Sequence, residues 1–591
     1  MSGDLTLALN SWIYPYSHPT NGGSPLFEMD NLVIAAGSAI NASWNGYAGG
    51  AAGFAGKGPG YGSGSGVTSG GAGHGGRSGT ASGLYGQTYG SSAAPIEPGS
   101  GGGNGGGAGG GVIRIAAANT VTVNGSLLAD GQTYPVYGGG GGAGGSIYVQ
   151  CQILEGTGGV LSAVGGGGSG GGGRIAVIFN SAAQSNAPLP DVKFTTAGGW
   201  WGNYPDDKRG DVGTLYFTDS QFLTRTNLIV HSGQWLAPDL ADGWTADSLI
   251  LSNTWLRFNT EGYRLAVNGN LSIVGTDGTL HMLQLSNGVA WCGGDLLMNN
   301  ASMRLYAGAT SGPSLACGGA LTLTNNAWIH VYSAPTNGVA PDYGALVSVT
   351  GLMTVASGSW VFPYSHSTNG GSALFRLNDL LIGTNAGFNA NDKGYSGSAS
   401  VGFGPGRGNS GSPGGGGGYG GFGGRAAFPY GQTYGSTNAP LSPGSGGGGT
   451  GGAGGGLVRI EAAGSVDLKG SILAKGQGFT GYMNTSGSGG GIFVMCQEFA
   501  SVNGVINADG GTGNSAGSGG GGGRIAVWHG VPESERARIL AGDRRGVVVT
   551  NAWAGCTASA TNGLYGTAAP TPGTVVFLTV KKNPGTLIIV R

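Results

Sequence analysis

The chain carries little charge, and the charge that it carries is balanced. Of its 591 residues, 26 are lysine or arginine, 27 are aspartate or glutamate, and charged residues make up 9% of the sequence. Proteins that bind nucleic acid or anionic membranes need a basic patch, and the sequence has no cluster of that kind. Disordered chains combine high net charge with few apolar residues, whereas 39% of this chain is hydrophobic. We therefore expect a folded protein that binds neither nucleic acid nor membrane.

Long apolar runs are also absent. No run approaches the ~18 residues that a membrane-spanning helix needs. The first residues, MSGDLTLALNSW, lack the basic and apolar regions of a signal peptide. Gly3 aligns with Gly351 in a later copy of the same passage, so the sequence begins partway into a repeat. This favours a mature fragment of a secreted protein over a cytoplasmic protein, and it predicts an extracellular or cell-surface location without membrane insertion.

Motifs for catalysis, metal binding and cofactor binding are missing as well. Strands follow the glycine runs that contain GxGxxG patterns, whereas a nucleotide site requires a helix there. His18 and His366 occupy equal places in PYSHPTNGG and PYSHSTNGG without an HxH or HxxxH partner, which favours turn capping. The densest charged cluster, NYPDDKRGD at 203–211, lies in a turn-like segment. A β-helix polysaccharide lyase or hydrolase is therefore the less favoured alternative, and we expect no catalytic residue, metal or cofactor.

The chain has only five cysteines, an odd number that cannot form a complete disulfide set. Cys292 in AWCGGDLLM and Cys317 in LACGGALTL lie 25 residues apart in matching frames. We expect them to be stacked on neighbouring coils, either as a disulfide or as two buried free thiols. Cys151 and Cys496 occupy equal places in VQCQ and VMCQ, which predicts buried positions.

Glycine is abundant, with 134 residues, and much of it lies in a passage that occurs twice. WIYPYSHPTNGG at 12–23 returns as WVFPYSHSTNGG at 360–371, and GGGVIRIAA at 109–117 returns as GGGLVRIEA at 454–462. The residue numbers of equivalent positions in the two copies differ by 348 for Trp12 and Trp360, by 345 for Cys151 and Cys496, and by 350 for Arg174 and Arg524. A long passage has therefore been duplicated around a different middle, which favours an extended repetitive body.

The middle of the chain has a regular local period. Leu271, Leu296 and Leu321 are spaced by 25 residues in GNLSI, GDLLM and GALTL, each within a strand of alternating polarity. Strands that return at this spacing without helical patterns predict stacked parallel coils. We therefore predict an all-β, internally duplicated protein, a right-handed parallel β-helix with long glycine-rich, polyproline II-like excursions. Only VPESERARILAG at 531–542 has a helical pattern.

Five segments follow from these patterns. They are a first glycine-rich copy at 1–180, a connecting β segment at 181–245, regular coils at 246–358, a second glycine-rich copy at 359–530 and a C-terminal β segment at 531–591. The glycine runs within the copies have two alternative structures. They form loose loops, or they pack as polyproline II segments whose backbones hydrogen-bond to each other. Aromatic residues recur within these glycine runs in both copies, which favours the packed structure.

Strands of the type GGGGRIAV after glycine runs resemble the glycine-rich polyproline II bundles of phage tail-fibre adhesin tips and of certain receptor ectodomains. The coil repeat resembles β-helical bacterial adhesins and surface-fibre proteins. The resemblance implies a secreted, non-enzymatic protein, the subunit of an extracellular fibre or surface stalk. The apolar segments GDLTLAL and TVVFLTVKKNPGTLIIVR near the two ends predict head-to-tail pairing with further copies. The alternative function is that of a glycan-binding adhesin.

Several side chains are candidates for contact with glycan or for modification. Arginines beside the strands either contact an anionic glycan or face solvent, namely Arg114, Arg174, Arg459 and Arg524. Aromatic residues beside glycine either bind sugar rings or pack on the glycine bundle, and they are Tyr85, Tyr89, Tyr430, Tyr434, Trp200 and Trp201. Sequons for N-glycosylation occur at Asn41, Asn124, Asn270, Asn300 and Asn484.

Overall fold

The structure is a computed structural model that describes residues 3–64, 70–79, 86–136, 138–200, 209–224, 226–276, 282–286, 288–308, 313–335, 342–410, 414–424, 431–478, 485–513, 517–541, 543, 545–564 and 569–580. Nearly every regular element is a β-strand, and the sheets are long and parallel. The prediction of an all-β protein is confirmed.

The chain consists of two compact units. The first comprises Met1–Trp244, Ile250–Asn259 and His281–Gln284. The second comprises Thr245–Leu249, Thr260–Leu280 and Leu285–Arg591. Segments of the predicted set of regular coils, residues 246–358, thus belong to both units.

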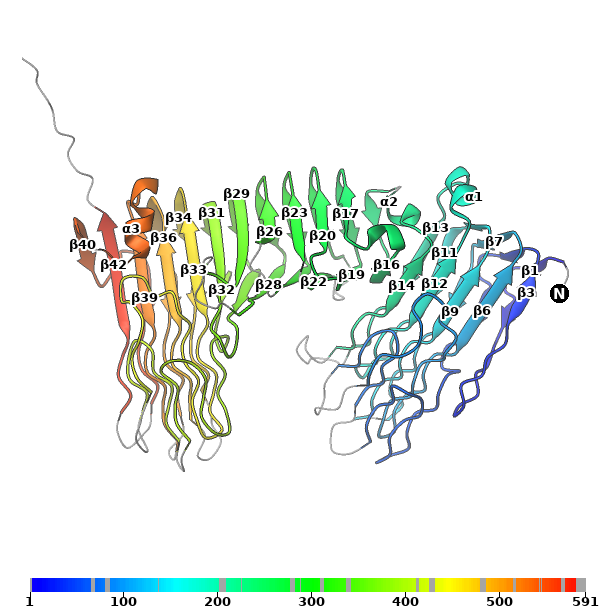
Figure 1. Cartoon of the computed structure of the whole chain (residues 1–591), viewed down its shortest axis with the longest axis horizontal. Coiled ribbons are helices and arrows are strands. Elements are labelled where there is room, and N and C mark those ends of the chain that lie inside the picture. Colours follow the sequence, from blue (N-terminus) through cyan, green and yellow to red (C-terminus); the bar gives the residue numbers. More distant parts are fainter. Residues whose placement is uncertain are drawn as a thin grey trace, which may run out of the picture. The chain divides into compact units, whose positions relative to one another are not determined.

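In the first unit, successive turns add strands to three parallel sheets (Figure 1). One sheet has the order β1 (Leu5–Leu7), β4 (Leu32–Ile34), β7 (Thr120–Val123) and β10 (Ile153–Glu155). The next has β2 (Trp12–Ile13), β5 (Ala39–Asn41), β8 (Ser126–Leu128), β11 (Thr157–Ser162) and β13 (Asp191–Thr195). The third has β3 (Phe27–Met29), β6 (Val112–Ala117), β9 (Ser146–Gln150), β12 (Arg174–Ile178), β14 (Thr214–Phe217), β16 (Gly233–Leu236) and β19 (Trp255–Phe258).

Short elements complete this unit and its boundary. They are α1 (Ser181–Asn186), α2 (Gln221–Thr224), the 3-10 helix η2 (Pro238–Leu240), β15 (Leu228–Ile229), β17 (Gly243–Ala246), β18 (Leu249–Ser252) and β22 (Met282–Ser286). The sequence patterns did not predict α1 or α2.

The second unit contains two rows of parallel strands. One row consists of β25 (Ser302–Tyr306), β28 (Trp328–Tyr332), β30 (Trp360–Tyr364), β32 (Gly387–Asn389), β35 (Ser471–Leu473), β38 (Gly504–Asn507) and β41 (Cys556–Ser559). The other contains β20 (Arg264–Val267), β21 (Leu271–Val274), β23 (Val289–Cys292), β24 (Leu296–Asn299), β26 (Pro313–Cys317), β27 (Leu321–Thr324), β29 (Ala345–Val355), β31 (Ala373–Ile382), β33 (Leu457–Ala462), β34 (Ser465–Leu468), β36 (Gly491–Met495), β37 (Glu498–Ser501), β39 (Arg524–His529) and β42 (Thr574–Val580).

The end of the second unit departs from the parallel pattern. Strand β40 (Val547–Thr550) pairs antiparallel with β42. The predicted helical segment forms η3 (Glu533–Glu535) and α3 (Arg536–Leu540), so that prediction is confirmed.

The regular coils stack in register. Leu271 pairs with Leu296, and Leu296 pairs with Leu321, across parallel strands β21, β24 and β27. All three side chains are buried, because every second residue of these strands faces the core. The predicted spacing of 25 residues per coil is confirmed.

The glycine-rich runs form packed bundles outside the sheets. In the first copy, Gly144 N donates to Gly171 O at 3.0 Å. The equivalent bond in the second copy runs from Gly489 N to Gly521 O at 2.9 Å. Figure 1 draws these segments as extended loops that leave the strand ends together. Within the described ranges, the glycine runs are packed, and the loose-loop alternative is wrong.

Glycine is needed because the backbones of neighbouring runs lie too close for a side chain. A Cβ atom on Gly144 would overlap the carbonyl oxygen of Ala163, and one on Gly489 would overlap that of Ala508. The missing side chains let each backbone N–H reach an acceptor on the next run. The duplication therefore preserved a packing arrangement as well as a composition.

Buried arginines replace the solvent-facing arginines expected from the sequence. Nε and Nη2 of Arg174 donate to Tyr89 O at 2.9 and 2.7 Å, and Nε of Arg524 donates to Tyr434 O at 2.9 Å. Arg174 and Arg524 are 7% exposed, and Arg459 is 3% exposed. The expectation of open, solvent-facing positions is wrong for these three residues, because other segments cover the outer faces of their strands.

Three buried histidines should make the fold sensitive to acid. Burial lowers the pKa of His74, His231 and His330 to about 3 each, because a charged imidazole would lose its hydration. In the unfolded chain a histidine pKa is about 6.5, so that state binds more protons below this pH. The free energy of unfolding should therefore fall on acidification below about pH 6.5, by roughly 1.4 kcal/mol per pH unit for each histidine.

Thermal unfolding followed by circular dichroism at a series of pH values measures this slope. His74→Asn should flatten it, because asparagine can still donate to Gly144 O, which His74 Nδ1 contacts at 2.9 Å, but does not titrate. His18→Asn is the matched control at an exposed position. Equal slopes for wild type and His74→Asn would contradict the assignment.

Candidate functional site

Two of the predicted aromatic residues, Tyr89 and Tyr434, pack inside the glycine bundles. The Tyr89 hydroxyl donates to Pro98 O at 2.5 Å, and its ring lies 4.7 Å from that of His74. The Tyr434 hydroxyl donates to Pro443 O at 2.5 Å, in the same arrangement. These contacts support the packing alternative for both tyrosines. Trp200 is half exposed, and its ring lies 5.3 Å from the Arg209 guanidinium, whereas Tyr85, Tyr430 and Trp201 lie outside the described residues.

The two cysteines of the regular coils face each other. Cys292 pairs in register with Cys317 across β23 and β26, which confirms their stacking on neighbouring coils. Both thiols are free and buried, so the predicted disulfide is not formed. Each sulfur instead contacts backbone carbonyls, including Gly294 O at 3.4 Å from both. The buried-thiol alternative describes this structure.

The described sequon asparagines bond to backbone groups nearby or on a neighbouring coil, and the paired histidines cap turns. Asn41 Oδ1 accepts from Ser43 N, Asn124 Oδ1 from Thr157 N and Asn270 Oδ1 from Asp295 N. Asn300 Nδ2 donates to Gly275 O, and Asn484 lies outside the described residues. Glycosylation of these residues stays a prediction. Nδ1 of His18 and of His366 accepts from a backbone N–H three residues later, which confirms the predicted turn capping.

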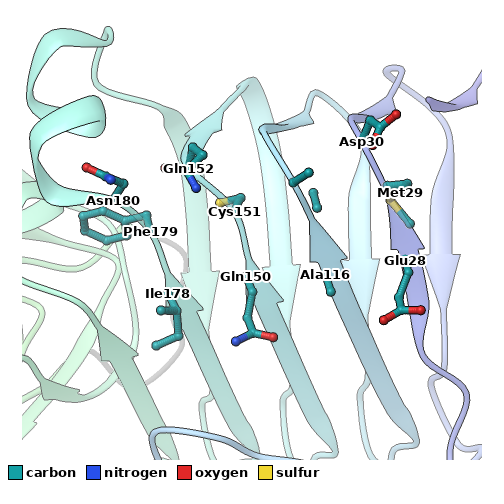
Figure 2. Close-up of a pocket in the computed structure, with 12 residues that line it drawn as sticks. Glu28, Met29, Asp30, Ala116, Gln150, Cys151, Gln152, Ile178, Phe179 and Asn180 are labelled. Carbon is teal, nitrogen blue, oxygen red and sulfur yellow. The ribbon is translucent and has the colours of Figure 1, made fainter. Parts of the chain in front are cut away.

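A groove of about 650 Å³ lies on the outer surface of the first unit (Figure 2). It crosses the ends of β3, β6, β9 and β12, so that each coil contributes to its wall. Register places Glu28 beside Ala116, Ala116 beside Gln150, and Gln150 beside Ile178. A second row follows at the corners where the strands end, with Asp30, Ala118, Gln152 and Asn180.

Amides and carboxylates dominate the rim of this groove, and buried apolar atoms form its floor. Glu28, Asp30, Gln150 and Gln152 are exposed, whereas Met29, Cys151 and Phe179 are buried. No lysine or arginine is among the described lining residues. Burial raises the pKa of the Cys151 thiol to about 12, so it stays uncharged and unreactive at neutral pH. The groove therefore offers hydrogen-bonding groups and negative charge without a nucleophile.

The sequence patterns did not predict this groove. Its rows join residues that lie far apart in the chain, since 87 residues separate Glu28 from Ala116, and a glycine bundle fills that interval. The available signal was an exposed polar residue near the end of two of these strands, Gln150 in SIYVQ and Glu28 in FEM. Register alone brings these positions together.

The first coil presents a second candidate surface, an aromatic face. Strands β1, β2 and β3 are each terminal in their sheets as described. Trp12, Tyr14 and Tyr16 on this coil are 47%, 54% and 69% exposed. The rings of Trp12 and Tyr14 are nearly parallel, with centroids 6.1 Å apart. We call these three residues the first-coil face.

The equivalent residues of the second copy are covered by a preceding coil. Phe362 stacks on His330 with centroids 4.7 Å apart, and Tyr364 stacks on Tyr332 at 4.2 Å. The strands show the same difference, since Leu5 of β1 pairs with Leu32, whereas the equivalent Met353 has neighbours on both sides in β27 and β31. The first-coil face is therefore a stacking surface whose neighbouring coil is missing among the described residues.

Comparisons with protein-family models, with curated proteins and with solved structures find no match to this chain. Within the described ranges, no group of histidine, cysteine, aspartate and glutamate could hold a metal ion. The helices found there are too short and too polar to cross a membrane.

Proposed function

We propose that the protein is a secreted structural subunit that stacks end to end in an extracellular fibre or surface stalk. The first-coil face carries this proposal, because its second-copy equivalents Phe362 and Tyr364 stack on aromatic side chains of a preceding parallel coil. This packing supports a parallel coil as the partner of the first-coil face. A second copy of the chain is the occupant we assign to it.

Charge complementarity supports head-to-tail contact. Residues 1–56 contain three acidic residues and no lysine or arginine, whereas residues 531–591 contain seven lysines and arginines and three acidic residues. At the other end of the described strands, β40 pairs with β42 on one side, and Val548 and Val549 are exposed. Opposite net charge in these two sequence segments favours one orientation of stacking, and a contact that does not close propagates as a fibre.

The finer architecture belongs to the same proposal. Parallel strands joined by crossovers within one sheet are right-handed in nearly all proteins, which supports a right-handed β-helix. Outside the sheets, the backbones of extended glycine runs hydrogen-bond to neighbouring runs. This supports polyproline II-like bundles.

Assembly can be tested by light scattering and electron microscopy of the purified chain. Wild type should form filaments or concentration-dependent oligomers, and added salt should weaken them. The variant Trp12→Ser/Tyr14→Ser/Tyr16→Ser should remain monomeric, because it lacks the stacking rings. Phe54→Ser/Tyr61→Ser is the matched control, since both side chains are exposed elsewhere. A wild-type protein that stays monomeric at every concentration would overturn the proposal.

A further inference from the structure

The groove of the first unit has an equivalent in the second copy that is closed. Glu461, Met495 and Trp528 take the places of Ala116, Gln150 and Ile178 in the aligned passages. Met495 and Trp528 are buried in a cluster with Val531 and Ile539, which belong to the segment around α3. Glu461 is also buried, and its Oε2 accepts from Arg536 of α3 at 3.1 Å. The second copy therefore covers this face with its own chain.

In the first copy the corresponding helix lies elsewhere. Helix α1 also follows the last strand of its copy, but its buried Gln184 side chain binds the backbone of β10. Gln184 Oε1 accepts from Leu154 N at 2.8 Å, and Nε2 donates to Leu154 O at 3.2 Å. This places α1 beside the groove rather than over it, as Figure 2 shows. The face stays open, and exposed Gln150 stands where the second copy has buried Met495.

The open face has the chemistry of a surface for hydroxyl-rich chains. Exposed Gln150 and Gln152 supply amide donors and acceptors, and Glu28 and Asp30 supply acceptors, on coils stacked ~4.8 Å apart. A linear glycan that runs across the strands would meet such groups repeatedly. The carboxylates and the absence of lysine and arginine from the described lining disfavour an acidic polysaccharide.

We propose that this groove binds a linear glycan without acidic groups, along the stacking direction of the coils. This inference goes beyond the proposed assembly, because the groove residues act within one chain. It gives the fibre subunit a lateral binding site.

Isothermal titration calorimetry of the full chain with neutral cello-, manno- and chito-oligosaccharides tests the inference, with an oligogalacturonide as the acidic comparison. At least one neutral probe should bind saturably, and the oligogalacturonide should bind more weakly. Gln150→Ala/Gln152→Ala should lower the affinity about tenfold, because two side-chain hydrogen-bonding groups are lost. Gln497→Ala is the matched control, since Gln497 is the exposed second-copy equivalent of Gln152.

Three results would overturn the inference. They are the failure of every neutral probe to bind, an affinity unchanged in Gln150→Ala/Gln152→Ala, and equal or tighter binding of the oligogalacturonide. Repeating the titration with Trp12→Ser/Tyr14→Ser/Tyr16→Ser separates glycan binding from assembly. Binding that persists in this variant supports the groove whether or not the chain forms fibres. Binding that is lost there would also overturn the inference, because it would move the site to the first-coil face.

Discussion

Gly109→Ala should destabilise the first glycine bundle by about 3 kcal/mol or more, through overpacking and lost backbone hydrogen bonds. A Cβ atom on Gly109 would overlap the carbonyl oxygen of Gly99, which is backbone and cannot rotate away. Gly109 also donates to Tyr47 O at 2.9 Å and accepts from Gly46 N at 2.8 Å. Separating the runs to admit the methyl group would stretch both bonds.

Denaturant unfolding of purified Gly109→Ala against wild type measures this loss. Gly23→Ala is the matched control, because a Cβ atom there meets no atom within 4 Å and the backbone is not in the left-handed region. We expect the control to lie within about 0.5 kcal/mol of wild type. If Gly109→Ala were as stable as Gly23→Ala, the packed bundle would be contradicted.

Glu461→Ala should cost about 3–5 kcal/mol, because it leaves a buried arginine without its main counter-ion. Glu461 Oε1 accepts from Nε and Nη2 of Arg459 at 2.9 and 2.7 Å. Both side chains are almost fully buried, so water cannot replace the lost carboxylate. The remaining partner of Arg459 is Asp342, whose side chain is 61% exposed.

Two further variants separate this cause from general damage to the fold. Arg376→Ala should have an effect below about 1 kcal/mol, because Arg376 is half exposed and lies 3.8 Å from Glu461. Glu461→Ala/Arg459→Met should recover part of the loss, because no unpaired charge remains buried. A single variant Glu461→Ala no less stable than Arg376→Ala would rule out the proposed role. Chemical denaturation measures all three.

The periodic parts of the fold were predictable because each coil repeats the same strand pattern and packs on its neighbour in the same way. The spacing of Leu271, Leu296 and Leu321 predicted the register that the structure shows, and the matching frames of Cys292 and Cys317 predicted their pairing. The helix near residue 536 followed from its composition. In these cases the neighbour of a residue lies one coil away, so sequence spacing is equivalent to spatial contact.

The burial of the arginines and the groove could not be predicted in this way, whereas packing of Tyr89 and Tyr434 on the glycine bundle was one of the two alternatives that the sequence left open. Arg174 meets Tyr89, 85 residues earlier, and Arg524 meets Tyr434, 90 residues earlier. The alternation of polar and apolar residues in a strand shows which side chains point away from the core. It does not show whether another segment covers those side chains. The same limit explains why the groove and its closed second-copy equivalent could not be distinguished.

The sequence by itself determined the all-β class, the duplication and the coil period, because these depend on composition and short spacing. The tertiary structure decided which outward faces are buried and which are open. Nearly identical strands, RIAVI at 174–178 and RIAVW at 524–528, end on an open groove in one copy and under α3 in the other. The difference arises because the covering helix docks on another strand end in the first copy, and that choice depends on long-range packing rather than on the strands.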